Sequence, residues 1–265
     1  MSLKNIFVFL AAALVLLVPQ MGVAAGLQKG ILVVTCDDGH KSQWESLAPI
    51  LQQCQIPATC YPVTSWIGDD LDFMIPAQLQ TLKERGWEFG NHTKNHVDAS
   101  KATDKVFLSD LDGAKQDLLG WGLGPIQAFA PPYGEFNSHT ADLVKSRGYT
   151  SLRQAWTENS DVNSPGAFTP FALDVISLKS NADSLAIIAW LDKLARDKVA
   201  GVLVIHQVDV AGDTYSITSV FATQIFSHAA GLIAEGKLEA TTISKMVRKI
   251  RPVNIQPALN LLLLN

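Results

Sequence analysis

Residues 31–40, Ile-Leu-Val-Val-Thr-Cys-Asp-Asp-Gly-His, decide the fold class of this chain of 265 residues. The apolar and β-branched run at 31–35 predicts a parallel strand that is buried on both faces. Asp37 and Asp38 follow at once, and Gly39 allows the chain to bend. Two carboxylates at the end of a buried strand are costly unless they are solvated, hydrogen-bonded or bound to a cation, although an acidic turn alone would look the same.

Strand-like and helix-like segments alternate outward from this stretch. Further strands are expected at 58–63, 87–90, 126–130, 150–152, 174–177 and 201–205, and helices at 42–53, 76–85, 104–119, 138–147, 183–196, 217–234 and 243–251. Ser42 and Glu45 form a capping-box pattern at the start of the first helix. This alternation predicts an α/β fold with a mostly parallel sheet or barrel in a single domain.

The composition excludes several classes of protein. Hydrophobic residues make up 48% of the chain, which is too many for a disordered protein. With 21 Lys and Arg against 25 Asp and Glu, the formal net charge is −4. A mildly acidic chain without a basic run is a poor candidate for binding nucleic acid or an anionic membrane.

The N-terminus has the pattern of a secretory signal peptide. Lys4 precedes an apolar run at 6–18, and small residues lead up to Ala25. The run is shorter than the roughly 20 residues that a membrane-spanning helix needs. We therefore expect a signal peptide at 1–25 and a domain at 26–265 that is exported to the periplasm or secreted, without stable membrane insertion after cleavage.

The three cysteines, Cys36, Cys54 and Cys60, are odd in number and lack the paired spacing of a zinc ribbon. They are predicted to be small buried hydrophobic residues, with at most one disulfide and no assigned pair.

Two histidines follow the predicted strand at 87–90. His92 and His96 are four residues apart, a spacing that places two side chains on one helical face and allows them to chelate one metal. Together with Asp38 they would make two imidazoles and one carboxylate, with positions left for water and substrate, as in a catalytic zinc or similar divalent site. The alternative is a chance pair of surface histidines.

Two more strand ends carry candidate groups. After the strand at 126–130, the prolines and the glycine of residues 130–134, Ala-Pro-Pro-Tyr-Gly, favour a rigid turn that can aim a backbone N–H at a substrate, although a purely structural turn would look alike. His206 follows the strand at 201–205 and is either a core or a catalytic histidine. The sequence assigns no role to the other histidines, which are His40, His139 and His228.

These segments, in this order, resemble the motifs of the polysaccharide deacetylase family, also called carbohydrate esterase family 4 or NodB-like domains. Residues 35–39, Thr-Cys-Asp-Asp-Gly, are similar to its first motif, 92–96 to its second, 130–134 to its third, and the strand ending at His206 to its fifth. The resemblance covers roughly residues 31–207. It implies a distorted (β/α) barrel of mostly parallel strands.

The resemblance also implies a set of site residues. Asp38, His92 and His96 would hold a divalent metal, usually Zn²⁺ in this family. Asp37 would be the general base that takes a proton from the attacking water, and His206 would donate a proton to the leaving group. The backbone N–H of Tyr133 would contribute to the oxyanion site. Val204 or Ile205 would line the acetyl pocket, with Trp156 as a weaker candidate.

The chain departs from the family pattern in two places. Ala130 stands where the third motif has an arginine that pairs with the catalytic base, and the fourth motif is not clear in the matching stretch at 149–156. We hypothesise that Arg153 supplies the missing cation from a different strand end. The alternative is that Arg153 is a solvated surface residue.

Together, the N-terminal pattern and the resemblance imply an exported, metal-dependent hydrolase that removes N-acetyl or O-acetyl groups from an acetylated polysaccharide. One alternative is a catalytically weak or silent carbohydrate-binding member of the same fold. Another is a small-molecule amidohydrolase on the same scaffold. The sequence leaves open the polymer, the choice of amide or ester, and the oligomeric state.

Overall fold

The computed structural model describes residues 26–68, 71–156 and 160–250. The expected signal peptide at 1–25 and the last residue of the helix expected at 243–251 lie outside the described residues. Within the described ranges, no helix combines the length and the apolar character needed to cross a bilayer.

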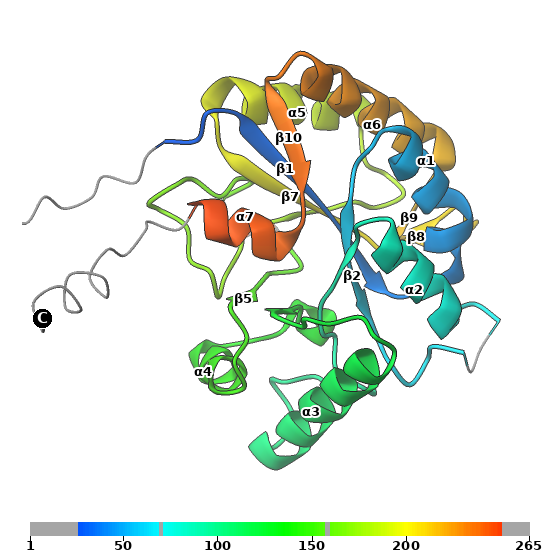
Figure 1. Ribbon diagram of the computed structural model, residues 1–265, viewed down its shortest axis with the longest axis vertical. Helices are drawn as coiled ribbons and strands as arrows, with labels where there is room; N and C mark the ends of the chain where they lie inside the picture. Colours follow the sequence, from blue (N-terminus) through cyan, green and yellow to red (C-terminus); the bar gives the residue numbers. More distant parts are fainter. Residues whose placement is uncertain (1–25, 69–70, 157–159, 251–265) are drawn as a thin grey trace, which may run out of the picture.

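A parallel sheet forms the centre of the molecule (Figure 1). Its middle strand is β1 (Gly30–Asp38), which pairs with β2 (Ala58–Pro62) on one side and β7 (Ala200–Ile205) on the other. Outside these lie β3 (Glu88–Phe89) and β6 (Ile176–Ser177), so the order is β3-β2-β1-β7-β6. All of these pairings are parallel, which confirms the predicted α/β class.

Two single bridges extend this sheet into a ring. β4 (Ala128–Phe129) pairs with β5 (Ser151–Leu152) in a separate short sheet. Asn91, just after β3, bridges to Phe129 in β4, and Arg153, just after β5, bridges to Leu173 ahead of β6. Strands β1 to β7 therefore follow one another around a closed ring in the order of the chain. On either side of the β4–β5 pair, a single bridge replaces regular strand pairing. This is a distorted barrel, as predicted.

One edge of β1 is shared by two strands. Residues 30–33 pair with β10 (Leu238–Thr241), whereas residues 34–38 pair with β2. β10 was not expected from the sequence, because four residues without an apolar or β-branched run give little strand signal. Beyond β7, the short strands β8 (Gln207–Val208) and β9 (Ser216–Ile217) also pair in parallel and were not expected.

Side chains of β1 alternate between two cores. Leu32 and Val34 pack in the cluster beneath the outer helices, whereas Ile31 and Val33 pack inside the barrel. The inner cluster also contains side chains of α7 (Ile243–Ile250), so this helix fills the amino end of the barrel. By the same two-residue period, Asp37 belongs to the inner face, at the opposite end.

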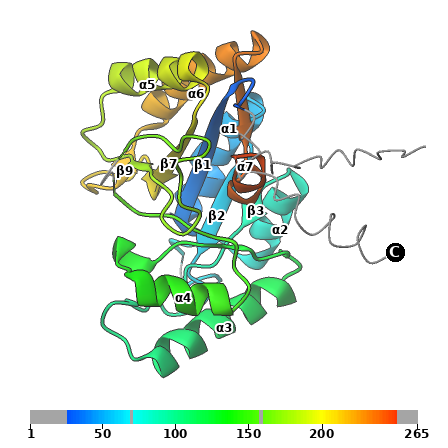
Figure 2. The same ribbon diagram turned by 90° about the vertical axis from the view of Figure 1, so that its left-hand side faces the viewer.

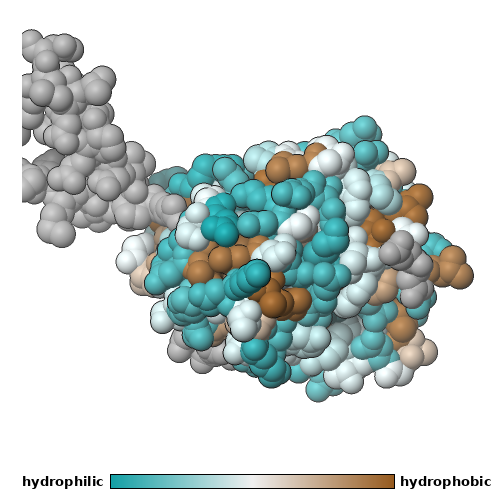
Figure 3. Space-filling view, turned by 90° about the horizontal axis from the view of Figure 1, so that it is seen from below, coloured by the Kyte–Doolittle hydropathy of each residue, from teal (hydrophilic) through white to brown (hydrophobic). Residues whose placement is uncertain are grey.

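Helices surround the sheet. They are α1 (Ala48–Gln53), α2 (Pro76–Glu84), α3 (Asp104–Gly120), α4 (Ser138–Ser146), α5 (Ser184–Asp197) and α6 (Ser219–Ala234). α5 and α6 pack together on one side, and α3 and α4 lie at the other end of the molecule (Figures 1 and 2). On the face seen from below in Figure 3, hydrophobic side chains form small groups among polar ones.

The first helix differs from its prediction. It begins as a π-helical turn, η1 (Gln43–Leu47), and continues as α1. Pro49 has no N–H to donate to the carbonyl of Glu45, and its ring would clash with that carbonyl in an α-helix, which favours the wider turn. The predicted capping box is wrong: Ser42 makes no cap bond, and its hydroxyl accepts from the N–H of Val208, 3.2 Å away.

All three cysteines are free thiols. Cys36 and Cys60 are register partners on β1 and β2, and both are fully buried in the outer core. Burial raises the pKa of both thiols, so they remain protonated and behave as small hydrophobic residues.

Candidate functional site

The candidate groups gather where strands of the barrel end. Asp37 and Asp38 are the last two residues of β1, and His92 follows β3 closely. Tyr133 lies in a short 3₁₀ turn, η2 (Pro132–Gly134), after β4, and His206 directly follows β7. Because all these strands are parallel, their carboxyl ends face the same side of the sheet.

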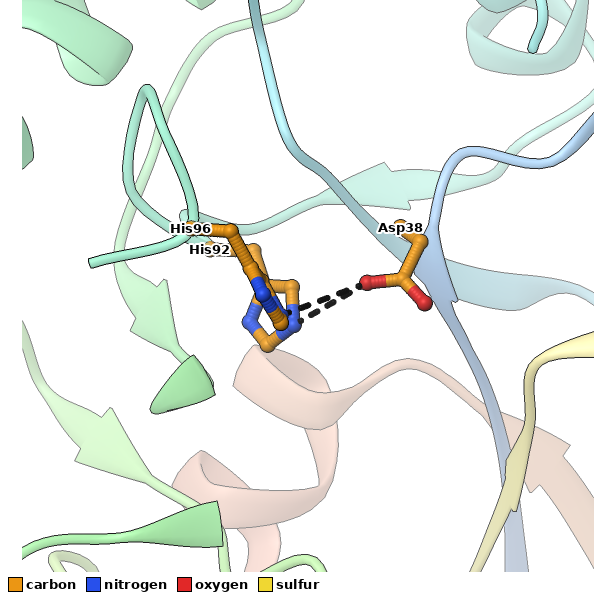
Figure 4. Close-up of side chains that lie close together, drawn as sticks. All are labelled: Asp38, His92 and His96. Atoms are coloured by element: carbon orange, nitrogen blue, oxygen red, sulfur yellow. Dashed lines mark ion pairs between the residues drawn. The ribbon is translucent and has the colours of Figure 1, made fainter. Parts of the chain in front are cut away.

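Three side chains form a compact cluster (Figure 4). The Oδ1 atom of Asp38 lies 3.4 Å from Nε2 of His92 and 3.6 Å from Nε2 of His96. The three ligand atoms all lie within 4.8 Å of one another. The aspartate comes from the end of β1, and both histidines come from the loop after β3. Their imidazole rings face the Asp38 carboxylate from the opposite side.

The two histidines are not on a helix, so that sequence expectation is wrong. Residues 92–96 form an irregular loop in which Thr93 and His96 have left-handed φ angles of 63° and 58°. Asn91 supports this loop by accepting from the N–H of Thr93, and its amide donates to the carbonyl of Leu111. The loop conformation, rather than helical spacing, brings the two imidazoles together.

The donor set fits a divalent cation. Asp38 Oδ1 is buried and has no hydrogen-bond partner among the described residues, so a buried anionic oxygen is left for a cation. Nδ1 of His92 lies 2.7 Å from the carbonyl oxygen of Ala130. Donation to that carbonyl fixes the tautomer, and the lone pair of Nε2 then points at the cluster.

The ionisation states of two of these side chains, Asp38 and His96, also suit metal ligands. Burial and the neighbouring His92 lower the pKa of His96 to about 4, so this imidazole is neutral near pH 7. Burial alone would raise the pKa of Asp38, but the adjacent His40 and His92 hold it well below its usual range. A carboxylate and a neutral imidazole are the forms that bind a metal.

His40, to which the sequence assigned no role, contacts the same carboxylate. Its Nε2 lies 3.3 Å from Asp38 Oδ2, the oxygen that does not face the two other histidines. The His40 ring stacks on Phe73, with ring centroids 4.9 Å apart. The contact therefore restrains the rotation of the Asp38 carboxylate. Its adjacency to the Asp-Asp-Gly stretch was the available sequence signal.

A second cluster lies beside the first. Asp37 is buried, and its Oδ1 is in direct contact with Nη2 of Arg153. Nε2 of His206 lies 3.7 Å from Asp37 Oδ2. Burial alone would raise the pKa of Asp37, but Arg153, followed by His92 and His206, outweighs it and lowers that pKa. Asp37 is therefore ionised at neutral pH.

Arg153 is fully buried, so it is not a solvated surface residue. Its guanidinium carbon lies 4.8 Å from the centroid of the Tyr61 ring, and Nη1 donates to the carbonyl of Gln154 at 2.9 Å. The backbone N–H of Arg153 donates to the backbone carbonyl of Phe129 in β4, the residue before Ala130. Arg153 thus reaches Asp37 from the strand beside the one that carries Ala130.

Gln43 joins the two acid–base candidates and was missed in the sequence. Its side-chain amide donates to the backbone carbonyls of Asp37 and His206, the latter at 2.7 Å. Burial lowers the pKa of His206, and its Nδ1 is buried without a partner among the described residues. No local pattern marks Gln43, because its position depends on the π-helical turn.

Tyr133 projects from the η2 turn with a left-handed φ of 60°. The N–H groups of Gly134 and Glu135 hold the turn, and the N–H of Tyr133 is not among those bonds. The Tyr133 ring lies 4.5 Å from the His96 ring. A Cβ at residue 134 would meet Nε1 of Trp156 at 2.9 Å, so only glycine allows this close packing.

The three residues expected to line the acetyl pocket lie in different surroundings. Val204 packs inside the barrel, whereas Ile205 points into the outer core, so Ile205 does not line the site. Trp156 is half-buried beside the Tyr133 turn.

Residues 25–152 match the family model for polysaccharide deacetylases. A peptidoglycan-N-acetylglucosamine deacetylase of Bacillus cereus is 30% identical over 138 residues, which are 51% of this chain and 62% of that protein. A poly-beta-1,6-N-acetyl-D-glucosamine N-deacetylase of Staphylococcus aureus is 26% identical over 145 residues, 48% of this chain and 50% of that protein. The match thus spans between half and two thirds of the length of these curated relatives.

A solved structure has the same fold. The family 4 carbohydrate esterase from Streptomyces lividans, in complex with acetate, superposes with a TM-score of 0.57 at 20% identity. The superposition covers 84% of this chain and 97% of that one. At this identity the likeness concerns the fold.

Proposed function

We propose that this chain is an exported, metal-dependent hydrolase that removes acetyl groups from a polysaccharide, because residues 25–152 match the family model for polysaccharide deacetylases. One observation carries the proposal: a buried, ionised Asp37 lies next to a cluster of Asp38, His92 and His96 with an unpartnered carboxylate oxygen. A base beside a metal site is what hydrolysis of an acetyl group requires.

Asp38, His92 and His96 hold the metal in this proposal. Two imidazoles and one carboxylate suit Zn²⁺ and leave coordination positions for water and substrate. A divalent cation bound there would polarise the acetyl carbonyl and lower the pKa of a coordinated water. Its charge would also remove the cost of leaving Asp38 Oδ1 buried without a partner.

Asp37 is the general base. Its carboxylate accepts the proton of the attacking water, and Arg153 keeps it ionised so that it can do so at neutral pH. Oδ2, which faces His206 rather than Arg153, is the oxygen available for the proton.

His206 is the general acid, and Tyr133 stabilises the developing oxyanion. Protonated His206 donates its proton to the leaving amine or alcohol, a transfer that its position beside Asp37 permits. The Tyr133 N–H, which the turn leaves free of its own bonds, donates to the acetyl oxygen as negative charge forms on it. The same groups would serve an N-acetyl amide or an O-acetyl ester.

Substrate class and location follow from the relatives and the N-terminus. The names of the two curated relatives describe N-deacetylation of glycans built from N-acetylglucosamine. We accordingly take an N-acetylated polysaccharide as the substrate. Export rests on the signal-peptide pattern at 1–25.

The proposal is tested by acetate release from N-acetylglucosamine oligomers and from acetylated xylan. The full chain is assayed with zinc, with a chelator, and as the Asp37→Asn variant. Release should require both metal and Asp37, with a loss of at least about a hundredfold in Asp37→Asn. Asp112→Asn is the matched control, because Asp112 also pairs with an arginine, Arg147, but in an exposed ion pair.

Either alternative function would give a different result. Glycan binding without acetate release from a folded, metal-loaded protein would indicate a silent carbohydrate-binding member. Release from monosaccharides but not from polymers would indicate a small-molecule amidohydrolase.

A further inference from the structure

Lys179 lies at the carboxyl end of β6, beside the proposed active site. Leu178 extends the pairing of β6 with β7 by donating its N–H to the carbonyl of Val204, 2.9 Å away. His206 directly follows β7. Lys179 and His206 therefore leave neighbouring parallel strands at the same edge of the barrel.

The ammonium of Lys179 rests on two aromatic rings. Its Nζ lies 4.7 Å from the centroid of the Trp156 ring and 5.3 Å from that of Tyr215. The Tyr215 ring is in turn 5.2 Å from the His206 ring, and Trp156 packs against Gly134. The two rings thus connect the oxyanion turn with the general acid, and Lys179 lies across both.

Among the described residues, no carboxylate pairs with Lys179, and its ammonium lies over the Trp156 and Tyr215 rings. The side chain is half-buried, as are both rings. Cation–π contacts compensate part of the lost hydration, but they neutralise no charge. A positive charge held in place at the rim of an active site attracts an anionic group of a bound ligand.

We propose that Lys179, Trp156 and Tyr215 form a subsite for a carboxylate-bearing sugar next to the acetylated sugar, so that the preferred substrate is an acidic acetylated glycan. The inference rests on the proposed function. The ammonium pairs with the carboxylate, and the two rings hold the ammonium in place beside His206 and Gly134. That carboxylate belongs either to a uronic acid or to a lactyl ether, which have the same charge chemistry.

The test compares acidic and neutral forms of the same polymer. Acetate release is measured on a copolymer of N-acetylglucosamine and glucuronic acid, on its carboxyl-reduced form, and on glycan strands that carry lactyl ethers. The wild type should have the higher kcat/KM on the acidic forms, and this preference should shrink with added salt because the Debye length is only about 10 Å at 0.1 M. A preference for one acidic polymer over the other identifies the source of the carboxylate.

Lys179→Met keeps the apolar stem but removes the charge. It should lower the acidic-to-reduced ratio of kcat/KM roughly fivefold to tenfold, through KM rather than kcat, as expected for one charge-assisted contact. Lys179→Arg should retain most of the ratio. Lys29→Met is the matched control, because Lys29 is exposed and precedes β1 at the opposite end of the barrel.

A binding arm separates this inference from the proposed function. Affinity for the acidic and the carboxyl-reduced polymers is measured by calorimetry in an Asp37→Asn background, with and without Lys179→Met. No acetate release from any polymer would contradict the proposed function, yet the affinities would still report on Lys179. Equal affinities for acidic and reduced polymers, or a preference that Lys179→Met retains, would overturn the subsite.

Discussion

Arg153 reaches the carboxylate of Asp37 from β5, although the resemblance places the corresponding cation at residue 130, on β4. Ala130 lacks the side chain, but β4 and β5 are adjacent, and the Arg153 guanidinium contacts the carboxylate of Asp37. A barrel interior is reached from several strands, so the same position in space can be filled from either. A positive charge therefore lies beside the proposed base, at a different place in the sequence from the one that the resemblance implies.

Removing Arg153 should shift the acid limb of the pH–rate profile. In the folded protein Arg153 lowers the pKa of Asp37, so Asp37 stays ionised, and able to act as a base, down to low pH. Arg153→Met should raise that pKa, and kcat/KM should then fall at a higher pH than in the wild type, with at least about a tenfold loss below neutral pH. An unchanged profile would show that Arg153 does not tune the base.

Two further variants serve as a rescue and as a control for Arg153→Met. Ala130→Arg in the Arg153→Met background should restore the acid limb, because it returns a guanidinium from the neighbouring strand. Arg147→Met, which breaks the exposed pair with Asp112, should leave the profile in place.

His40 should affect metal affinity through Asp38. Since His40 contacts Oδ2 and restrains the carboxylate, His40→Ala should weaken zinc binding about tenfold to a hundredfold, measured by competition with a chromophoric chelator. His139→Ala is the control, because His139 also contacts an aspartate through Nε2, Asp104, at the surface. Equal zinc affinity in wild type and His40→Ala would contradict the role.

Among single residues, the sequence indicated those whose type and position at the end of a predicted strand already suggest a function. Asp37, Asp38, His92 and His206 stand at predicted strand ends, and the structure brings them together. Gln43 carries no such signal, because an amide acquires its function only through the two carbonyls that it reaches.

The π-helical turn η1 is the element that places Gln43. Its wider spacing turns the side chain towards the carboxyl ends of β1 and β7, where one amide donates to the backbone carbonyls of Asp37 and His206. Turns of this kind occur frequently at functional sites.

Gln43→Met should therefore reduce both stability and turnover. It keeps the length of the side chain but removes the amide donor from the carbonyl of His206, at a cost of about 1–3 kcal/mol for an unsatisfied buried group, whereas the carbonyl of Asp37 still accepts from the N–H of Gly39. Tm should fall, and kcat should drop about tenfold or more because Asp37 and His206 lose their common support. Gln80→Met is the control, since Gln80 donates to the carbonyl of Trp121 in an exposed contact. A loss of Tm with full kcat would limit Gln43 to a structural role.

Sequence patterns predicted the long elements well and the short ones poorly. β1 and β7 are apolar runs, and α3 and α5 are preceded by Thr103 and Asp183, whose side chains cap them. β10 and η1 depend on tertiary context: β10 pairs only with a distant strand, and η1 results from Pro49 together with the contacts of Gln43.

Over the whole molecule, the inner core separates the site from the closed end of the barrel. α7 places Met246 and Val247 inside the ring at the amino ends of the strands, while the ionisable groups occupy the carboxyl ends. Stability and chemistry thus depend on different ends of the same inner core.

Met246→Ala should lower stability without affecting metal binding. Met246 is fully buried, and its truncation should cost about 2–5 kcal/mol, visible as a lower Tm. Zinc affinity below the melting range should equal that of the wild type. Val220→Ala is the control, because Val220 is 76% exposed on α6 and should leave Tm almost unchanged. A parallel loss of zinc affinity would show that the two ends are coupled.

The divided edge of β1 has a consequence for the order of events during synthesis. Among the strands of the described residues, β1 is the first to be synthesised, yet the partner of its amino half, β10, is the last. β7, on its other side, also arrives late. Pairing between such distant segments makes folding slow, and the central strand stays incomplete until β10 has been made. A chain that is late to fold is available in extended form to a translocation channel.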